Sequence, residues 1–201
     1  MAKLNLHRVT IGQLQEIDLT ISPGEIVCLS GPSGCGKTRL LRAIADLEPH
    51  SGHVQLGKIR QGEVPGHRWR AAVMLVPAES AWWHDTVGAH LVGNNTSALE
   101  QLGFDDDVCQ WPIARLSSGE KHRLALVRAL SRRPAALLLD EPTANLDREN
   151  TAKVETWLRT IIREQQLPTL WVAHHEDQIQ RVADRHFVIV DKHIEAREVS
   201  R

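Results

Sequence analysis

A glycine-rich segment at residues 31–38 has the composition and spacing of a phosphate cradle. It reads GPSGCGKT, that is Gly31, Pro32, Ser33, Gly34, Cys35, Gly36, Lys37 and Thr38. Glycines let several backbone N–H groups converge on phosphate oxygens, and a helix starting at the loop adds the positive end of its dipole. Lys37 offers a positive charge to the β- and γ-phosphates, and Thr38 offers a hydroxyl to Mg²⁺. The segment therefore predicts nucleotide binding with Mg²⁺.

A second chemical signal is a pair of adjacent carboxylates at the end of an apolar run. Residues 135–139 are apolar, and Asp140, Glu141 and Pro142 follow them. A buried strand of this kind delivers Asp140 beside the Mg²⁺ of a phosphate loop. Glu141, one residue later, leaves the strand and can reach an attacking water. The alternative interpretation is an ordinary strand end with two solvated acids.

The third signal is the run LSSGE at residues 116–120, which opens an amphipathic segment. Serine and glycine N–H groups at a helix N-terminus can bind an anion, which would make a second such site in the chain. The simpler interpretation is that Ser117 only caps the helix. The segment alone does not decide between the two.

The elements that must position these residues follow from hydrophobic patterning. Short apolar runs predict strands at 25–30, 72–76, 135–140, 169–173 and 187–190, and longer amphipathic runs predict helices at 37–46, 117–131 and 147–165. Strands that alternate with helices predict an α/β fold with a mostly parallel sheet flanked by helices. Alternation at 4–6 and 14–21 predicts a small antiparallel front, Ser51-Gly52 a turn, and residues 79–116 short helical pieces.

Composition narrows the possible classes of function. The chain has 201 residues, with 24 basic and 25 acidic side chains and a formal net charge of −1. It lacks the basic footprint of a nucleic-acid binder, so we expect no nucleic-acid partner. Its three cysteines form no CxxC pair, which fits a reducing, cytoplasmic compartment. We expect no signal peptide and no membrane-spanning segment.

Taken in order, these motifs resemble those of the ATP-binding-cassette (ABC) ATPases over nearly the whole chain. GPSGCGKT resembles the Walker A loop, LSSGE the signature motif, and ALLLDEP at 136–142 the Walker B strand with its catalytic glutamate. Residues 144–147 resemble the D-loop, and His174, rather than the adjacent His175, resembles the switch histidine. The resemblance implies a P-loop NTPase fold in a single domain over 1–201, with 79–116 as an inserted helical subdomain.

The resemblance also implies the activity, the cofactors and the partners. It predicts an ATPase that uses ATP and Mg²⁺, with Thr38 and Asp140 at the metal and with Glu141 and His174 as catalytic residues. It predicts a head-to-tail homodimer in which residues of one copy contact the nucleotide of the other: Ser117, Gly119, Glu120 and Asp147. A separate permease would hold the dimer at the cytoplasmic face of the membrane, where hydrolysis would power transport.

Two departures from the family pattern stand out. The position usually held by a glutamine, after the strand at 72–76, is Ala78. No aromatic residue precedes Trp69, so the usual adenine platform upstream of the phosphate loop is missing; His7 and Ile11 are nearest to its place. The tryptophans at 82, 83 and 111 are interpreted as core residues or, alternatively, as part of a permease-docking surface.

Other functions stay open at this level. One is a non-transport ABC ATPase of the DNA-repair or translation type, and another is a P-loop small-molecule kinase. DNA-repair ABC ATPases carry a long inserted coiled coil and translation-type ones usually carry a second cassette, and this sequence shows neither. In a small-molecule kinase, the LSSGE segment would have no role. For the cargo, the motifs look similar to small metal (iron) export cassettes.

Overall fold

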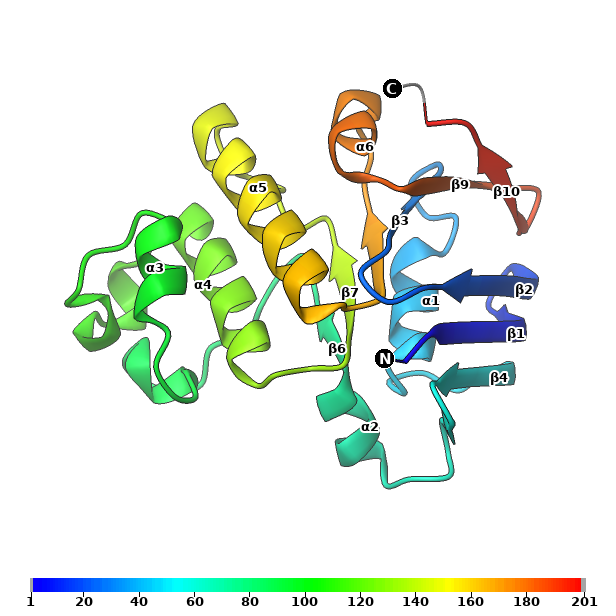
Figure 1. Ribbon diagram of the computed structural model, residues 1–201, viewed down its shortest axis with the longest axis horizontal. Helices are drawn as coiled ribbons and strands as arrows, with labels where there is room; N and C mark the ends of the chain where they lie inside the picture. The colour runs from blue at the N-terminus through cyan, green and yellow to red at the C-terminus, as the bar shows by residue number, and fades with distance from the viewer. Residues whose placement is uncertain (1, 200–201) are drawn as a thin grey trace.

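The computed structural model describes residues 2–199, and its largest sheet is built around the strand that precedes the phosphate loop. This strand is β3 (Ile26–Ser30), and the six strands lie in the order β10-β9-β3-β8-β7-β6 (Figure 1). The others are β6 (Val73–Val76), β7 (Ala136–Asp140), β8 (Thr169–Val172), β9 (Arg185–Val190) and β10 (His193–Arg197). All pairs are parallel except β9 with β10. The sheet therefore brings the C-terminal ends of β3, β7 and β8 to one edge.

A second, four-stranded antiparallel sheet forms the front of the molecule. Its order is β2-β1-β4-β5, made from β1 (Leu4–Ile11), β2 (Leu14–Ile21), β4 (Ser51–Leu56) and β5 (Ile59–Arg60). The alternation of buried and exposed positions in β1 and β2 gives this sheet one apolar face and one polar face. The predicted antiparallel front is confirmed, with two more strands than the sequence indicated.

Helices cover both faces of the large sheet. They are α1 (Lys37–Ile44), α2 (Gly66–Ala72), α3 (Thr96–Gln101), α4 (Ser118–Ser131), α5 (Arg148–Gln165) and α6 (Glu176–Val182). Three short 3₁₀ turns are η1 (Gly88–His90), η2 (Val108–Gln110) and η3 (Ile113–Arg115). Helix α1 packs between the two sheets, while α4 and α5 lie side by side on the far side from β1 and β2 (Figure 1).

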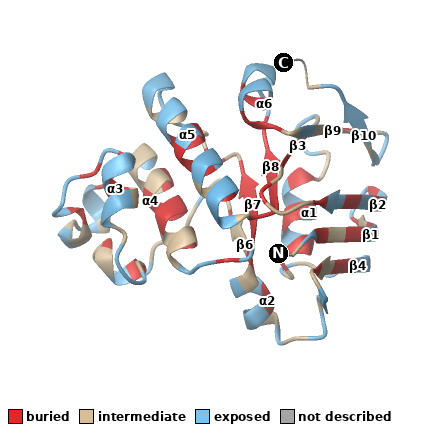
Figure 2. Cartoon of the chain, viewed as in Figure 1, coloured by how far each residue is buried: buried red, intermediate tan, exposed pale blue. Residues whose placement is uncertain are grey.

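The period of two in β3 divides the core into two parts. Val27 and Leu29 face α1 and the antiparallel sheet, whereas Ile26 and Cys28 face the core formed with α4, α5 and α6. Strand β7 is buried at every position, while β10 is mostly exposed (Figure 2). Buried hydrophobic surface on both faces holds the strand ends, and hence the loop after β3, in fixed positions.

Several elements differ from the sequence prediction. Ser51-Gly52, predicted as a turn, begins β4: the Cα of Gly52 packs so closely on the Arg8 carbonyl that an added Cβ would collide with it. Elements β4, β5, β10 and α2 were not predicted, because their sequences are short or mostly polar. Helix α1 ends at Ile44 rather than at residue 46. By contrast, the prediction of short helical pieces at 79–116 is confirmed by α3 and the three 3₁₀ turns.

Within residues 2–199, no helix has the length and apolar character needed to cross a membrane.

Candidate nucleotide-binding site

The loop between β3 and α1 forms the predicted cradle. Lys37, at the start of α1, is only 6% exposed, and its ammonium donates to the carbonyls of Gly31 at 2.8 Å and Pro32 at 3.0 Å. Gly36 has φ +107°, and a Cβ added there would lie 3.3 Å from the side chain of Leu14. Only glycine combines that backbone angle with so close a neighbour. The loop therefore places a buried cation and the N-terminus of α1 at one point.

Asp140 reaches the same point from the end of β7. Thr38 donates its hydroxyl hydrogen bond to Oδ2 of Asp140 at 2.9 Å, although 102 positions separate the two residues. The other oxygen, Oδ1, is buried and has no hydrogen-bond partner among the described residues. Burial raises the pKa of Asp140, and the neighbouring Glu141 carboxylate raises it further.

The arrangement of Thr38 and Asp140 fits a Mg²⁺ ion. Both supply oxygen donors, which Mg²⁺ prefers. The unpartnered Oδ1 of Asp140 is a buried acceptor that a cation would satisfy. The charges of Asp140 and Glu141 raise the affinity of this edge for a divalent ion.

Glu141 and His174 meet at the same edge of the sheet. Glu141 follows β7, His174 follows β8, and His174 Nε2 lies 2.7 Å from Glu141 Oε1. Their side chains are 37% and 38% exposed, so both can reach a bound molecule. His175 is exposed and stands at the N-cap position of α6 instead. Of the two adjacent histidines, the structure thus brings only His174 to the carboxylate.

The LSSGE segment forms a capping box at the start of α4. Ser117 Oγ accepts from the Glu120 N–H at 3.2 Å, and Glu120 Oε2 accepts from the Ser117 N–H and hydroxyl, each at 2.8 Å. The hydrogen bond from the Ser117 N–H is the main reason why the pKa of Glu120 is lowered. Within one chain, the capping interpretation of Ser117 is therefore correct. The polar groups of Ser117 and Glu120 serve their own helix.

The LSSGE segment lies against the residues that follow Glu141. A Cβ added at Gly119 would lie 3.3 Å from the side chain of Leu146. Next in the chain, Asp147 caps α5 and accepts from the Asn150 N–H at 2.8 Å, which lowers the pKa of Asp147. Residues 144–147 therefore pack against the start of α4.

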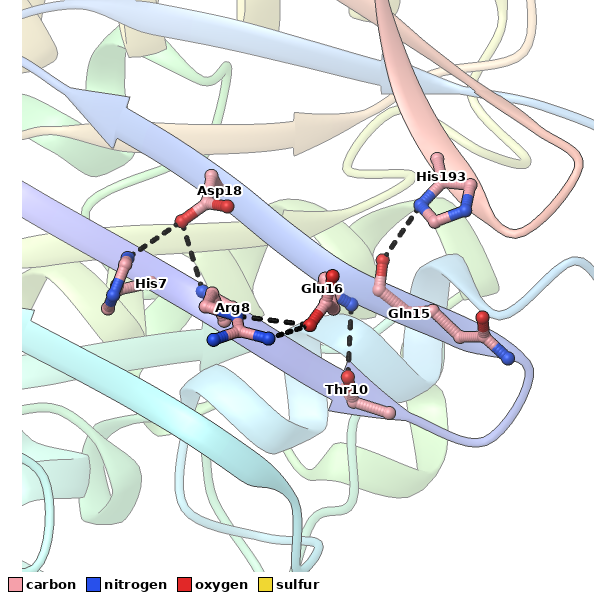
Figure 3. A network of polar contacts seen from close by, with 7 residues as sticks. All are labelled: His7, Arg8, Thr10, Gln15, Glu16, Asp18 and His193. Atoms are coloured by element: carbon pink, nitrogen blue, oxygen red, sulfur yellow. Dashed lines mark hydrogen bonds and ion pairs between the residues drawn. The ribbon is translucent and has the colours of Figure 1, made fainter.

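The residues considered for the missing aromatic platform have other environments. Ile11 is 5% exposed and belongs to the core between the sheets. The ring of His7 lies on the outward face of the hairpin, where its Nδ1 is 2.9 Å from Asp18 Oδ1 (Figure 3). Ala78 lies just after β6, and its methyl group offers no hydrogen bond.

Sequence reasoning missed a polar network behind the carboxylate edge. Buried Glu155 accepts from Gln178 at 2.9 Å and from Arg181 at 2.7 and 2.9 Å, and Gln178 also donates to Thr143 at 2.6 Å. Three members of this network, Thr143, Gln178 and Arg181, border a cavity of about 510 Å³ together with His174 and Glu141. The only signal in the sequence was a charged residue, Glu155, at a core-facing helix position. Such a pattern does not indicate which residues will form hydrogen bonds with it.

Comparison with known proteins agrees with this geometry. A family model described as "ABC transporter" matches residues 14–144. The aliphatic sulfonates import ATP-binding protein SsuB 1 of Nocardia farcinica is 38% identical over 183 residues, 88% of this chain and 71% of the relative. SsuB 2 of Frankia alni is 35% identical over 197 residues, 92% of this chain and 76% of that protein.

Among solved structures, a bacterial Atm1-family ABC exporter with ATP bound has the same fold. Its TM-score is 0.86 at 22% identity, and the match covers 98% of this chain and 38% of the exporter chain. The family model covers well over half of the chain, and the sequence relatives exceed 30% identity over most of their length. The chain therefore belongs to the ABC transporter family, as an ATP-binding subunit whose hydrolysis of Mg-ATP powers transport through a separate permease.

Proposed function

We propose that Glu141 is the general base for ATP hydrolysis and that His174 positions it. The carrying observation is the 2.7 Å contact between the two side chains, at the edge where Thr38 meets Asp140. His174 donates from Nε2 to one carboxylate oxygen, which leaves the other free to accept a proton from water. The water oxygen then bonds to the γ-phosphorus as the bond to the ADP oxygen breaks.

The phosphate loop holds the leaving group in this scheme. Lys37 turns its ammonium from the loop carbonyls to the β- and γ-phosphates, and the N–H groups of residues 31–38 bind the phosphate oxygens. Thr38 and Asp140 hold Mg²⁺, which neutralises phosphate charge when bound.

The signature residues serve the nucleotide of a second copy. In a head-to-tail dimer, Ser117, Gly119 and Glu120 of one copy face the phosphate loop of the other, and Asp147 lies at the same boundary. The first turn of α4 is exposed at Ser117 and Ser118, so its N–H groups are accessible to an anion. The whole of 1–201 acts as one domain in which 79–116 is a helical subdomain.

The test uses a Glu141 variant that should bind ATP without hydrolysing it, and it compares substitutions of the two adjacent histidines, His174 and His175. Glu141→Gln keeps the hydrogen bond to His174 but cannot take the proton, so the variant should bind Mg-ATP and elute at twice the monomer mass. His174→Ala should lose hydrolysis by about a hundredfold or more, whereas His175→Ala should retain it. A Glu141→Gln protein that hydrolyses ATP at the parent rate would refute the assignment.

The cargo and the location are part of the same proposal. The relatives described above are named for aliphatic sulfonate import, so we assign this chain to an importer of small organic sulfonates. The iron-export hypothesis draws no support from those relatives. The subunit acts at the cytoplasmic face, bound to a separate permease. Deleting the gene should abolish growth on an aliphatic sulfonate as sole sulfur source and leave growth on sulfate unchanged.

A further inference from the structure

The order of the strands determines on which side of β3 the terminal phosphate and the nucleoside of a bound nucleotide lie. Glu141 and His174 follow β7 and β8, both on one side of β3 in the sheet. Hydrolysis acts on the terminal phosphate, so that phosphate must lie on the β7–β8 side of the loop. The nucleoside must then extend towards the other side of β3, where β9 and β10 lie.

The hairpin of β1 and β2 occupies this other side. The Gln15 N–H donates to the Lys192 carbonyl at 2.9 Å, and His193 donates from Nδ1 to the Gln15 carbonyl at 3.0 Å (Figure 3). The start of β2 also lies against the phosphate loop, because Leu14 packs on Gly36. The tip of the hairpin, at residues 12–13, is therefore the surface that a nucleoside leaving the loop would meet.

One planar cationic side chain lies at this tip. The guanidinium of Arg39, in the first turn of α1, packs on Gly12 so closely that a Cβ added to Gly12 would collide with it. The Arg39 side chain is 54% exposed. Its Nε donates to Glu48 Oε2 at 3.1 Å, the only hydrogen bond that the described residues give this side chain. The guanidinium is thus held in place while one face stays accessible.

We infer that the Arg39 guanidinium is the surface on which the purine base of the nucleotide stacks, in place of an aromatic ring. The inference rests on the proposed function, because it takes the phosphate loop as the nucleotide site. A guanidinium is planar and always charged, and it stacks on π-systems, nucleobases included. Since either purine offers a π-face, ATP and GTP should bind within about tenfold of each other.

Arg42 supplies a matched control, because Glu48 pairs with both arginines. The Nε of Arg42 donates to Glu48 Oε1 at 2.8 Å. Arg42 and Arg39 therefore share charge, exposure and partner, but only Arg39 packs on Gly12. A general effect of removing a surface cation from α1 would appear in both variants.

The experiment compares binding of Mg-ATP and of Mg-tripolyphosphate, which has the phosphates but no base, by calorimetry. Arg39→Ala should weaken Mg-ATP binding by about fivefold or more and leave tripolyphosphate binding unchanged. Arg39→Lys, which keeps the charge without the planar face, should lose most of the same affinity for Mg-ATP. Arg42→Ala should bind both compounds like the parent protein.

Each contrary result has a separate meaning. Equal weakening of ATP and tripolyphosphate by Arg39→Ala would show a phosphate contact and overturn the stacking role. Unchanged ATP affinity in Arg39→Ala, with a parent protein that binds normally, would overturn this inference alone. A parent protein that binds neither compound would overturn the proposed nucleotide site and this inference together.

Discussion

Lys37 is buried, and among the described residues its ammonium has no carboxylate partner; it contacts two loop carbonyls and the Cys35 sulfur. Such a group gains most when an anion enters the loop. Lys37→Ala should therefore weaken Mg-ATP binding at least about tenfold, or about 1.4 kcal/mol, as measured by calorimetry. Lys58→Ala removes an exposed lysine elsewhere and should bind normally. Equal affinities of the two variants would contradict the phosphate role of Lys37.

Cys35 sits inside the same loop, with its sulfur 3.9 Å from the Lys37 ammonium. A maleimide on this partly exposed thiol would fill the space for phosphate. We expect N-ethylmaleimide to abolish ATP hydrolysis, Mg-ATP to protect, and Cys35→Ser to resist. Cys28 is buried, and burial raises the pKa of its thiol, so it should stay unmodified. Full activity after complete modification of Cys35, checked by mass spectrometry, would refute this prediction.

Ala78 presents a methyl group where a longer polar side chain could reach the reaction edge. A glutamine there could hold the attacking water beside Glu141. Ala78→Gln should raise the basal ATPase rate of the isolated subunit by at least about twofold, whereas Ala78→Val adds bulk without an amide and should not. A parent protein already as fast as Ala78→Gln would show that water placement is not limiting.

At the scale of elements, the strands that could be predicted from the sequence are those with a strong hydrophobic pattern. Strands β3, β7 and β8 are mostly apolar runs that end at Ser30, Asp140 and Val172, and each was predicted to within a residue or two. Strand β10, with the sequence HIEAR, is an exposed edge and carries no apolar signal. Pairing with β9 makes it a strand, and pairing partners are invisible to local patterning.

Within residues 79–116, a buried histidine organises the chain after β6. His90 is 1% exposed, and its Nε2 accepts the N–H groups of Trp83 and His84, each at 3.1 Å, while its Nδ1 donates to the Thr86 carbonyl at 2.9 Å. Only a neutral ring can accept at Nε2. Burial, helped by the charges of Arg128 and His84, lowers the pKa of His90.

This lowered pKa sets the direction of a pH effect. Below about pH 6.5, the unfolded chain binds a proton at this position before the folded one does, so the free energy of unfolding falls as the pH falls. The rings of Trp82 and Trp83 lie 4.8 and 4.9 Å from that of His90. Tryptophan fluorescence should therefore change below pH 6.5, and His90→Gln should remove this step. If the fluorescence step persisted in His90→Gln and disappeared in His84→Gln, His84 rather than His90 would be responsible for it, and the prediction would be wrong.

At the scale of the whole molecule, the sequence predicted the motifs but not which of their residues come into contact in the fold. GPSGCGKT and ALLLDEP each announce their chemistry in the sequence, yet Thr38 and Asp140 meet only because β3 and β7 flank β8. Which histidine meets Glu141 also depends on how the chain leaves β8. The Glu155 network was not predicted, since a buried ion pair has no local sequence signature.

A head-to-tail dimer makes a prediction about mixtures. Lys37→Ala damages the phosphate loop, and Ser117→Arg blocks the start of α4, so each homodimer should be inactive. In a mixed dimer, one site pairs an intact loop with an intact α4. An equal mixture should therefore recover about a quarter of the parent ATPase rate. If the phosphate loop and the α4 start of each site came from the same chain, mixing the two variants would restore no activity. Circular dichroism of each variant serves as the control that it folds.

The central place of β3 also has a consequence for synthesis on the ribosome. Its two neighbours, β8 and β9, are made only after residue 168, and Asp140 emerges 102 residues after Thr38. At about 5–20 residues per second, translation leaves the phosphate loop without Asp140 for roughly 5–20 seconds. During that interval both edges of an apolar strand lack their native partners, so the nascent chain offers chaperones a binding segment before it can engage nucleotide.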